Sequence, residues 1–253
     1  MGRFWSANDR EAREVSLQRG YYRDTAGRYD TLHVRGNGDG NLGEHDLAAA
    51  FMIGAIPRLG VRSVLDIGSG TGRALSHLKA SLPHLRIVGI EPSSELRAEG
   101  YRKGLTEEEL VDGDAQALSY PAGAFDLVCG FGSLHHMPRP SDAVAEMLRV
   151  ARTAVFISDS NNFGQGGLLS RFVKQALNAC GLWPLADFIK TQGKGYTVSD
   201  GDGLAYSYSV FNDYRRIRKA CDSVHILNTD GARINPYRSA SHVAVLAIKK
   251  RNA

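Results

Sequence analysis

The sequence predicts an α/β fold in which a mostly parallel sheet carries helices on both of its faces. Short apolar segments typical of buried strands alternate with segments of helical periodicity, and the connections between them are short. Right-handed crossovers between parallel strands produce this alternation. A glycine cluster at 68–72, directly after the first expected strand, supports the same fold, because parallel sheets bind ligands at such strand-to-helix turns.

The expected elements follow one another in regular order along the chain. Apolar residues with helical spacing predict a helix over 44–58, and the next apolar segment, 61–67, predicts a buried strand that ends at the glycines. The alternation then continues with helix 73–80, strand 86–90, helix 93–102, strands 110–111 and 125–129, helix 141–150 and strand 154–157.

The rest of the chain departs from this alternation and then returns to it. The segment 161–208 is rich in glycine and aromatic residues, contains an expected helix at 168–178, and interrupts the pattern as a lid would. A helix over 210–220 then precedes two strands, 224–227 and 242–248, which are close enough in sequence to pair as an antiparallel hairpin.

Composition limits the class of protein. With 253 residues, 43% of them hydrophobic, the chain can bury one core, and we expect a helical cap at 1–60 before a main domain at 61–253. The net charge is only +4 and the basic residues are dispersed, so no nucleic-acid partner is expected. Cys129, Cys180 and Cys221 are too far apart for a disulfide framework. Without a signal peptide or a long apolar run, we expect a cytoplasmic protein with no membrane span.

Three glycines at alternate positions, Gly68, Gly70 and Gly72, lie where the first strand turns into a helix. Because glycine has no Cβ, the backbone there can turn sharply and a ligand can approach it closely. A dinucleotide-binding fingerprint would have its third glycine at position 73, where this sequence has Arg73. A nicotinamide cofactor is therefore the less favoured alternative.

Carboxylates follow three successive expected strands. Asp66 lies just before the glycines, where it can accept hydrogen bonds from a ligand ammonium but would repel a pyrophosphate. Glu91 ends the second strand, at the distance where an acidic residue reaches the hydroxyls of a ribose. Asp114 follows the third strand and can accept the exocyclic amine of an adenine. The three carboxylates favour a ligand with an ammonium, a ribose and an adenine, and no phosphate.

These segments resemble the class I S-adenosylmethionine-dependent methyltransferases, in particular the type 11 branch that includes the ubiquinone and menaquinone methyltransferases. The matching features are LDIGSGTG at 65–72, Glu91, Gly-Asp-Ala at 113–115 and FDLVCGFGSLHH at 125–136. The resemblance covers about 61–158 and implies a Rossmann-like, seven-stranded sheet whose last strand is antiparallel. It also implies S-adenosylmethionine as the cofactor, with the following binding residues: Tyr22, Tyr29, Asp66, Gly68, Ser69, Gly70, Gly72, Glu91, Pro92, Asp114, Ala115 and Phe131.

The N-terminal segment 21–30 resembles the part of these enzymes that folds over the cofactor. Tyr22 or Tyr29 can cover the sulfonium, because the electron-rich face of an aromatic ring attracts a cation. The alternative is that both tyrosines only pack a cap helix.

Two adjacent histidines, His135 and His136, follow the fourth expected strand at the mouth of the predicted site. A hydroxyl acceptor has a high pKa and needs a base within hydrogen-bond reach, and a histidine can supply it. Neighbouring side chains point in different directions, so we expect only one histidine to face the acceptor, and we favour His136. The alternative is that both histidines only cap the turn before Pro138.

Methyl donation itself requires no metal, but two groups of residues resemble metal ligands. Asp159, after the fifth strand, could join His135 and His136 in binding a divalent ion that lowers the pKa of an acceptor hydroxyl, or it could simply cap a turn. The Gly-Asp runs at 37–42 and 200–203 lack the glycine and glutamate of a calcium loop. Both runs are therefore expected to be hinges.

The favoured function is O-methylation of a hydroxylated small molecule, such as a sugar or a biosynthetic intermediate, with the segment 161–208 as the acceptor lid. The polar and aromatic content of that segment suits a hydroxyl-rich ligand. N- or C-methylation, a nicotinamide-dependent oxidoreductase and a noncatalytic cofactor-binding protein are the alternatives.

Overall fold

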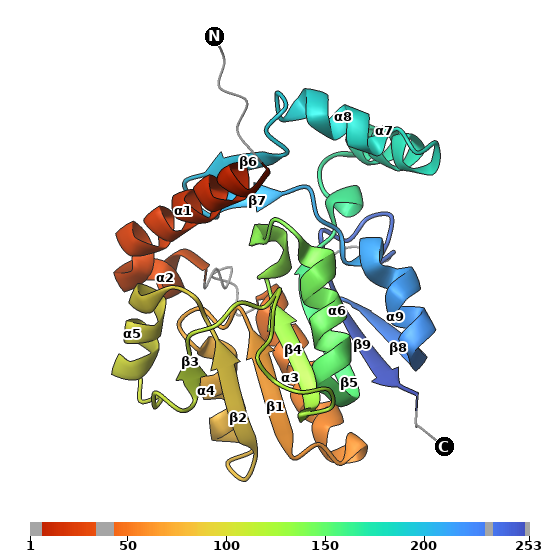
Figure 1. Cartoon of the computed structure of the whole chain (residues 1–253). Coiled ribbons are helices and arrows are strands. Elements are labelled where there is room, and N and C mark those ends of the chain that lie inside the picture. The colour runs from red at the N-terminus through yellow and green to blue at the C-terminus, as the bar shows by residue number, and fades with distance from the viewer. Residues whose placement is uncertain (1–6, 34–42, 231–234, 251–253) are drawn as a thin grey trace.

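The computed structural model describes residues 7–33, 43–230 and 235–250, and in these ranges a seven-stranded sheet lies between two layers of helices (Figure 1). The strand order is β3-β2-β1-β4-β5-β9-β8. The strands are β1 (Ser63–Ile67), β2 (Arg86–Ile90), β3 (Leu110–Val111), β4 (Phe125–Phe131), β5 (Ala151–Ser160), β8 (Cys221–Asn228) and β9 (His242–Lys249). The pairs among β1 to β5 are parallel, whereas β9 runs antiparallel to both β5 and β8. The predicted fold, including the antiparallel last strand, is confirmed.

Helices cover both faces of the sheet. They are α3 (Glu44–Leu59), α4 (Arg73–Ser81), α5 (Ser94–Arg102), α6 (Pro140–Val150) and α9 (Tyr214–Ala220). One apolar cluster joins the sheet to α3 and α4, and a second joins its other face to α6 and α9. Side chains alternate between the two clusters along β1, where Val64 packs in one and Leu65 in the other. A sheet buried on both faces explains why its strands are almost wholly apolar.

The N-terminal cap and the lid lie together beyond the carboxyl ends of the strands (Figure 1). The cap consists of α1 (Ala7–Thr25), a 3₁₀ turn (Ala26–Arg28) and α2 (Tyr29–His33). The lid contains α7 (Leu168–Ala179), α8 (Trp183–Lys190), β6 (Tyr196–Ser199) and β7 (Gly203–Tyr206), the last two paired as a hairpin. Among the described residues, no helix is both long and apolar enough to cross a bilayer.

Most predicted elements agree with the structure. β2 and β3 have the predicted bounds, whereas β5 begins three residues early, where Ala151 pairs with Phe125 of β4 and Arg152 forms an ion pair with Asp126. The helix predicted over 210–220 divides into a 3₁₀ turn (Val210–Asp213) and α9, and the predicted hairpin of the last two strands forms. The bounds of α1, α8, β6 and β7 were not predicted, since these segments contribute few residues to the core.

The lid helices turn their apolar sides outward. Leu168, Phe172 and Phe188 are 80%, 70% and 60% exposed, and no side chain of α7 or α8 is buried. By contrast, Arg171 and Gln175 of α7 hydrogen-bond to backbone carbonyls of the protein body. The lid is therefore attached to the body largely through polar contacts, unlike the helices that cover the sheet.

Asn161, at the end of β5, connects the sheet to the segments that follow it. Its side-chain nitrogen donates to the carbonyls of Pro236, Tyr237 and Ala240 at 2.8–3.0 Å, and its oxygen accepts from the Ser209 hydroxyl at 2.9 Å. We expect N161A to lower the free energy of unfolding by about 2–3 kcal/mol, because buried carbonyls lose their donor. Urea titration followed by circular dichroism measures this change.

A suitable control is N178A, since Asn178 is exposed and makes one side-chain hydrogen bond, to the Tyr237 hydroxyl. Its effect should stay within about 0.5 kcal/mol. Equal effects of the two substitutions would contradict the structural role given to Asn161.

Candidate functional site

The glycine loop after β1 has a backbone that only glycine adopts easily. Gly68, Gly70 and Gly72 have φ values of +63°, +55° and +74°, in the left-handed region. A Cβ atom on Gly68 would lie 2.5 Å from the Cβ of Ser133, so the loop also packs too closely for a side chain there. Because these positions have no side chains, a ligand can approach the loop backbone at the carboxyl end of β1, next to the first turn of α4.

Glu91 fixes the shape of this loop from the end of β2. Its two carboxylate oxygens accept hydrogen bonds from the backbone N–H groups of Gly70 (2.9 Å) and Ser93 (2.8 Å). Burial raises its pKa to about 7, although these two bonds oppose the shift. Each oxygen keeps a lone pair, so the carboxylate can still accept from a ligand hydroxyl.

Asp66 is a buried carboxylate that faces the cavity. Its Oδ1 lies 3.5 Å from the Cys129 thiol, and no lysine or arginine of the described ranges forms an ion pair with it. Burial raises its pKa to about 7. A ligand ammonium would supply the missing cation, and this is the part of S-adenosylmethionine that the site fits best.

A cavity of about 620 Å³ extends from this loop to the histidines. Of the predicted cofactor residues, those that line it are Tyr29, Asp66, Gly68, Ser69, Gly70 and Phe131.

The other predicted cofactor residues do not line the cavity. Tyr22 packs edge-on against Tyr29, Pro92 is exposed, and Ala115 is buried in the core. Gly72 lies where α4 begins, and Glu91 acts behind Gly70. The exposed Asp114 accepts from the backbone N–H of Gln116, so its carboxylate is engaged in a turn.

The cap is bound to the glycine loop. Asp30 accepts a 2.6 Å hydrogen bond from the Thr71 hydroxyl and also forms an ion pair with Lys103. Tyr29 contacts the loop, since a Cβ on Gly70 would lie 3.5 Å from its ring. Tyr22 packs against Tyr29 rather than against the loop, and the prediction that one of these rings covers the sulfonium stays a prediction.

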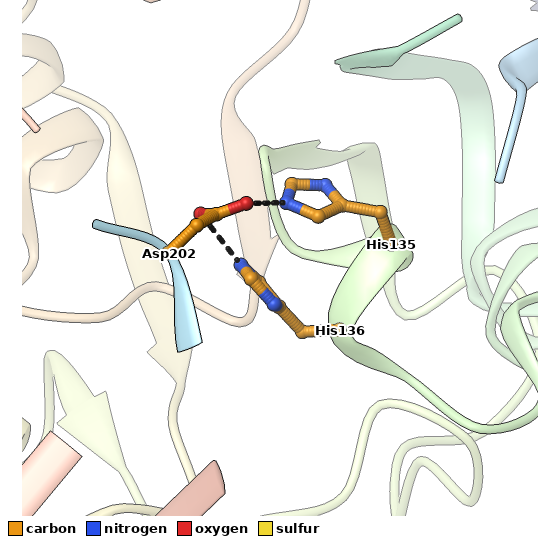
Figure 2. A group of neighbouring side chains, drawn as sticks. All are labelled: His135, His136 and Asp202. Carbon is orange, nitrogen blue, oxygen red and sulfur yellow. Dashed lines mark ion pairs between the residues drawn. The ribbon is translucent and has the colours of Figure 1, made fainter. Parts of the chain in front are cut away.

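His135 and His136 form a 3₁₀ turn (Leu134–His136) after β4, and each ring is held by its Nδ1 atom. Nδ1 of His135 lies 2.6 Å from the carboxylate of Asp159, which also accepts from the backbone N–H groups of Leu134 and Ser160. Nδ1 of His136 donates to the carbonyl of Leu204 at 2.6 Å. The Nε2 atoms of both rings face Asp202, at 3.3 and 3.4 Å (Figure 2).

The charges of this cluster are strongly coupled. Burial alone would lower the pKa of His135, but Asp159 and Asp202 raise it to about 10. Burial likewise opposes ionisation of Asp159, and the nearby His135 nevertheless lowers its pKa to about 2. The pKa of Asp202 lies well below its ordinary value because both histidines face it, against the effect of burial.

Asp202 is a site residue that sequence reasoning did not identify. It lies in the turn between β6 and β7, in the Gly-Asp run interpreted as a hinge, and the fold of the lid brings it to the histidines. Asp159, in contrast, lies on the other side of His135 from Asp202 and does not line the cavity. The only available signal was an acidic residue between two glycines of the lid. The other Gly-Asp run, 37–42, lies outside the described residues.

The buried carboxylate of Asp66 makes stability depend on pH. Between pH about 4 and 7 the unfolded chain loses this proton while the folded chain keeps it, so stability falls as pH rises through that window and the cost stays constant above it. We expect D66N to stabilise the protein by roughly 1–3 kcal/mol at pH 8, and by less at lower pH. Denaturant titrations at pH 5.5 and 8 measure the difference.

Asp222, an exposed carboxylate on β8, provides the matched control. D222N should show no comparable gain at either pH. If D66N destabilised the protein at pH 8, the assignment of Asp66 as an uncompensated buried charge would be wrong.

Several methyltransferases are similar to this chain in sequence or in fold. A family model described as a methyltransferase domain matches residues 65–157. Ajmaline N-methyltransferase of Rauvolfia serpentina is 32% identical over 100 residues, which cover 38% of this chain and 34% of that protein. Demethylmenaquinone methyltransferase of Deinococcus radiodurans is 32% identical over 129 residues, which cover 49% and 52%. The chain thus spans about a third to a half of the length of these curated relatives.

Solved structures extend the likeness to the whole fold. The 1,6-didemethyltoxoflavin-N1-methyltransferase of Burkholderia thailandensis has a TM-score of 0.58 at 15% identity, covering 99% of this chain and 94% of that one. Magnesium protoporphyrin IX methyltransferase of Synechocystis has a TM-score of 0.56 at 15% identity, covering 94% and 100%. The match of residues 65–157 to the methyltransferase-domain model agrees with the predicted family, and the solved structures agree with the predicted fold.

Proposed function

We propose that this protein transfers the methyl group of S-adenosylmethionine to a hydroxyl of a small polar acceptor. The observation that carries the proposal is the continuity of the cavity, which is lined by Asp66 and the glycine loop at one end and by the histidine pair at the other. A cofactor and an acceptor bound in one water-poor space can meet in line, and positioning of this kind supplies much of the catalysis in methyl transfer.

The cofactor end of the cavity supports the proposed binding roles. Asp66 accepts from the ammonium of the methionine moiety, Glu91 holds the backbone of Gly70 in place from behind and has lone pairs left for a ribose hydroxyl, and Tyr29 covers the loop. When bound, the cofactor supplies an electrophilic methyl group on a positively charged sulfur. Exclusion of water by the cap strengthens these electrostatic interactions.

The acceptor end of the cavity is polar. The lid and the adjoining residues contribute the side chains of Asn162, Gln165, Lys190, Thr197, Ser199, Asp202, Tyr206, Ser207 and Tyr208. Hydroxyl, amide and ammonium groups suit a ligand rich in hydroxyls, such as a sugar or an oxygenated biosynthetic intermediate. This composition favours a small-molecule acceptor over a nucleic acid.

The histidine pair supports oxygen as the methylated atom, because a hydroxyl must lose its proton as the methyl group arrives. His135 has a pKa near 10 and already holds a proton at neutral pH, so it is poorly suited to accept another. His136 presents Nε2 to the cavity while its Nδ1 donates to Leu204. His136 is therefore the residue that we propose to act on the acceptor proton.

Calorimetric titration with S-adenosylmethionine tests the cofactor. We expect one molecule to bind per chain, NAD not to bind, and D66N to weaken binding at least about tenfold, because a charge-assisted contact to the ammonium is lost. Tight binding of NAD in place of S-adenosylmethionine would overturn the proposal. Mass spectrometry of acceptor mixtures then identifies the compound that gains one methyl group.

Substitution of His136 tests the chemistry. We expect H136A to lower kcat by about 10²- to 10⁴-fold and to change the dissociation constant of S-adenosylmethionine less than twofold. His225, an exposed histidine on β8, provides the control, and H225A should leave both constants unchanged. An amine acceptor needs no such base near neutral pH, so full activity of H136A would contradict O-methylation.

A further inference from the structure

Three side chains in the cavity wall present metal-ligand atoms to one point (Figure 2). Nε2 of His135 lies 3.3 Å from one carboxylate oxygen of Asp202, and Nε2 of His136 lies 3.4 Å from the other. All the ligand atoms lie within 4.8 Å of one another, and all three residues line the cavity. The cluster combines two imidazoles and one carboxylate, a set that transition metals bind well.

The distances between the Nε2 atoms and the Asp202 oxygens match those between two ligand atoms of one metal ion. Ligand bonds of about 2.0–2.2 Å at tetrahedral angles place neighbouring ligand atoms roughly 3.3–3.5 Å apart. A direct ion pair between a protonated imidazole and a carboxylate is shorter, at about 2.7–2.9 Å. The short contact of His135 to Asp159, 2.6 Å, has that direct character, whereas the contacts to Asp202 do not.

The outer hydrogen bonds of the two rings aim Nε2 at this point. The carbonyl of Leu204 can only accept, so Nδ1 of His136 carries a hydrogen and Nε2 of the neutral ring has a lone pair. The carboxylate of Asp159 selects the same tautomer of His135. A carboxylate or carbonyl behind each ring is the usual support of a metal-binding histidine. A metal ion would replace the proton that His135 otherwise holds and would join both Nε2 atoms to the Asp202 carboxylate.

We propose that His135, His136 and Asp202 bind a divalent transition-metal ion, such as Zn²⁺ or Fe²⁺, with positions left open toward the cavity. The two nitrogen ligands disfavour Mg²⁺ and Ca²⁺, which prefer oxygen. The catalytic meaning of the ion rests on the proposed function: with Nε2 of His136 bound to the ion, His136 would act on the acceptor proton through the ion, at which a hydroxyl loses its proton more readily. The ion would also join the lid to the turn after β4, since Asp202 and the histidines come from these two segments.

Metal titration without S-adenosylmethionine tests the site. The whole chain, without a histidine tag and stripped with a chelator, is titrated with Co²⁺ and Zn²⁺ by calorimetry and by visible absorption of Co²⁺. We expect one ion per chain, and D202N and H136A to weaken binding at least about tenfold, because each removes one of three protein ligands. Asp200 lies in the same turn but outside the cluster, so D200N should bind like the natural protein.

The outcomes separate the metal site from the proposed function. Lack of Co²⁺ binding, equal binding by D202N and the natural protein, or a preference for Mg²⁺ would overturn the metal site. Co²⁺ binding without any binding of S-adenosylmethionine would instead contradict the proposed function and leave the metal site in place. Circular dichroism confirms that each variant is folded before its affinity is compared.

Discussion

The parallel pairing of β1 with β4, and of β4 with β5, determines where the glycine loop and the histidine turn of the cavity lie. Ile67 pairs with Gly130, and Phe131 pairs with Ser158, so the three strands end at nearly the same level. The glycine loop, the histidine turn and Asp159 then follow at one edge of the sheet. Because the strands are buried on both faces, a shift of register would expose core residues, and the site is as fixed as the core.

Two buried carboxylates at this edge, Asp66 and Glu91, reduce stability at neutral pH. Asp66 and Glu91 have raised pKa values because they are buried, and the partners of Asp66 are the neutral side chains of Ser69 and Cys129. Asp159 is equally buried but has His135 and two backbone N–H groups as partners, so its pKa is lowered. The contrast separates Asp66, which has no cationic partner in the described residues, from Asp159, which holds the ring of His135 in place.

The sequence predicted the parts of this site that depend on local pattern. The glycines, Asp66 and Glu91 stand next to strands that hydrophobicity identifies, so their places at the sheet edge followed from the topology alone. Asp202 could not be placed in this way. It is 67 positions after His135 in the sequence, and the lid that brings it to the histidines buries too few apolar residues for its fold to be predicted from hydrophobicity. The helix α1 was equally hard to delimit, since polar bonds such as Gln18 to the Leu204 N–H hold it in place.

The weak attachment of the lid gives the cavity a way to open. The cap contacts the lid through the bonds of Gln18 to Leu204 and of Tyr206 to Glu14, each of which contributes about 1 kcal/mol, far less than the core contributes to the sheet. Leu204 also accepts from His136, so the same strand of the lid touches both the cap and the histidine turn. Movement of that strand would break these bonds and shift Asp202, which directly precedes it, relative to His136. Opening of the cavity at β7 would therefore also separate the members of the cluster of His135, His136 and Asp202.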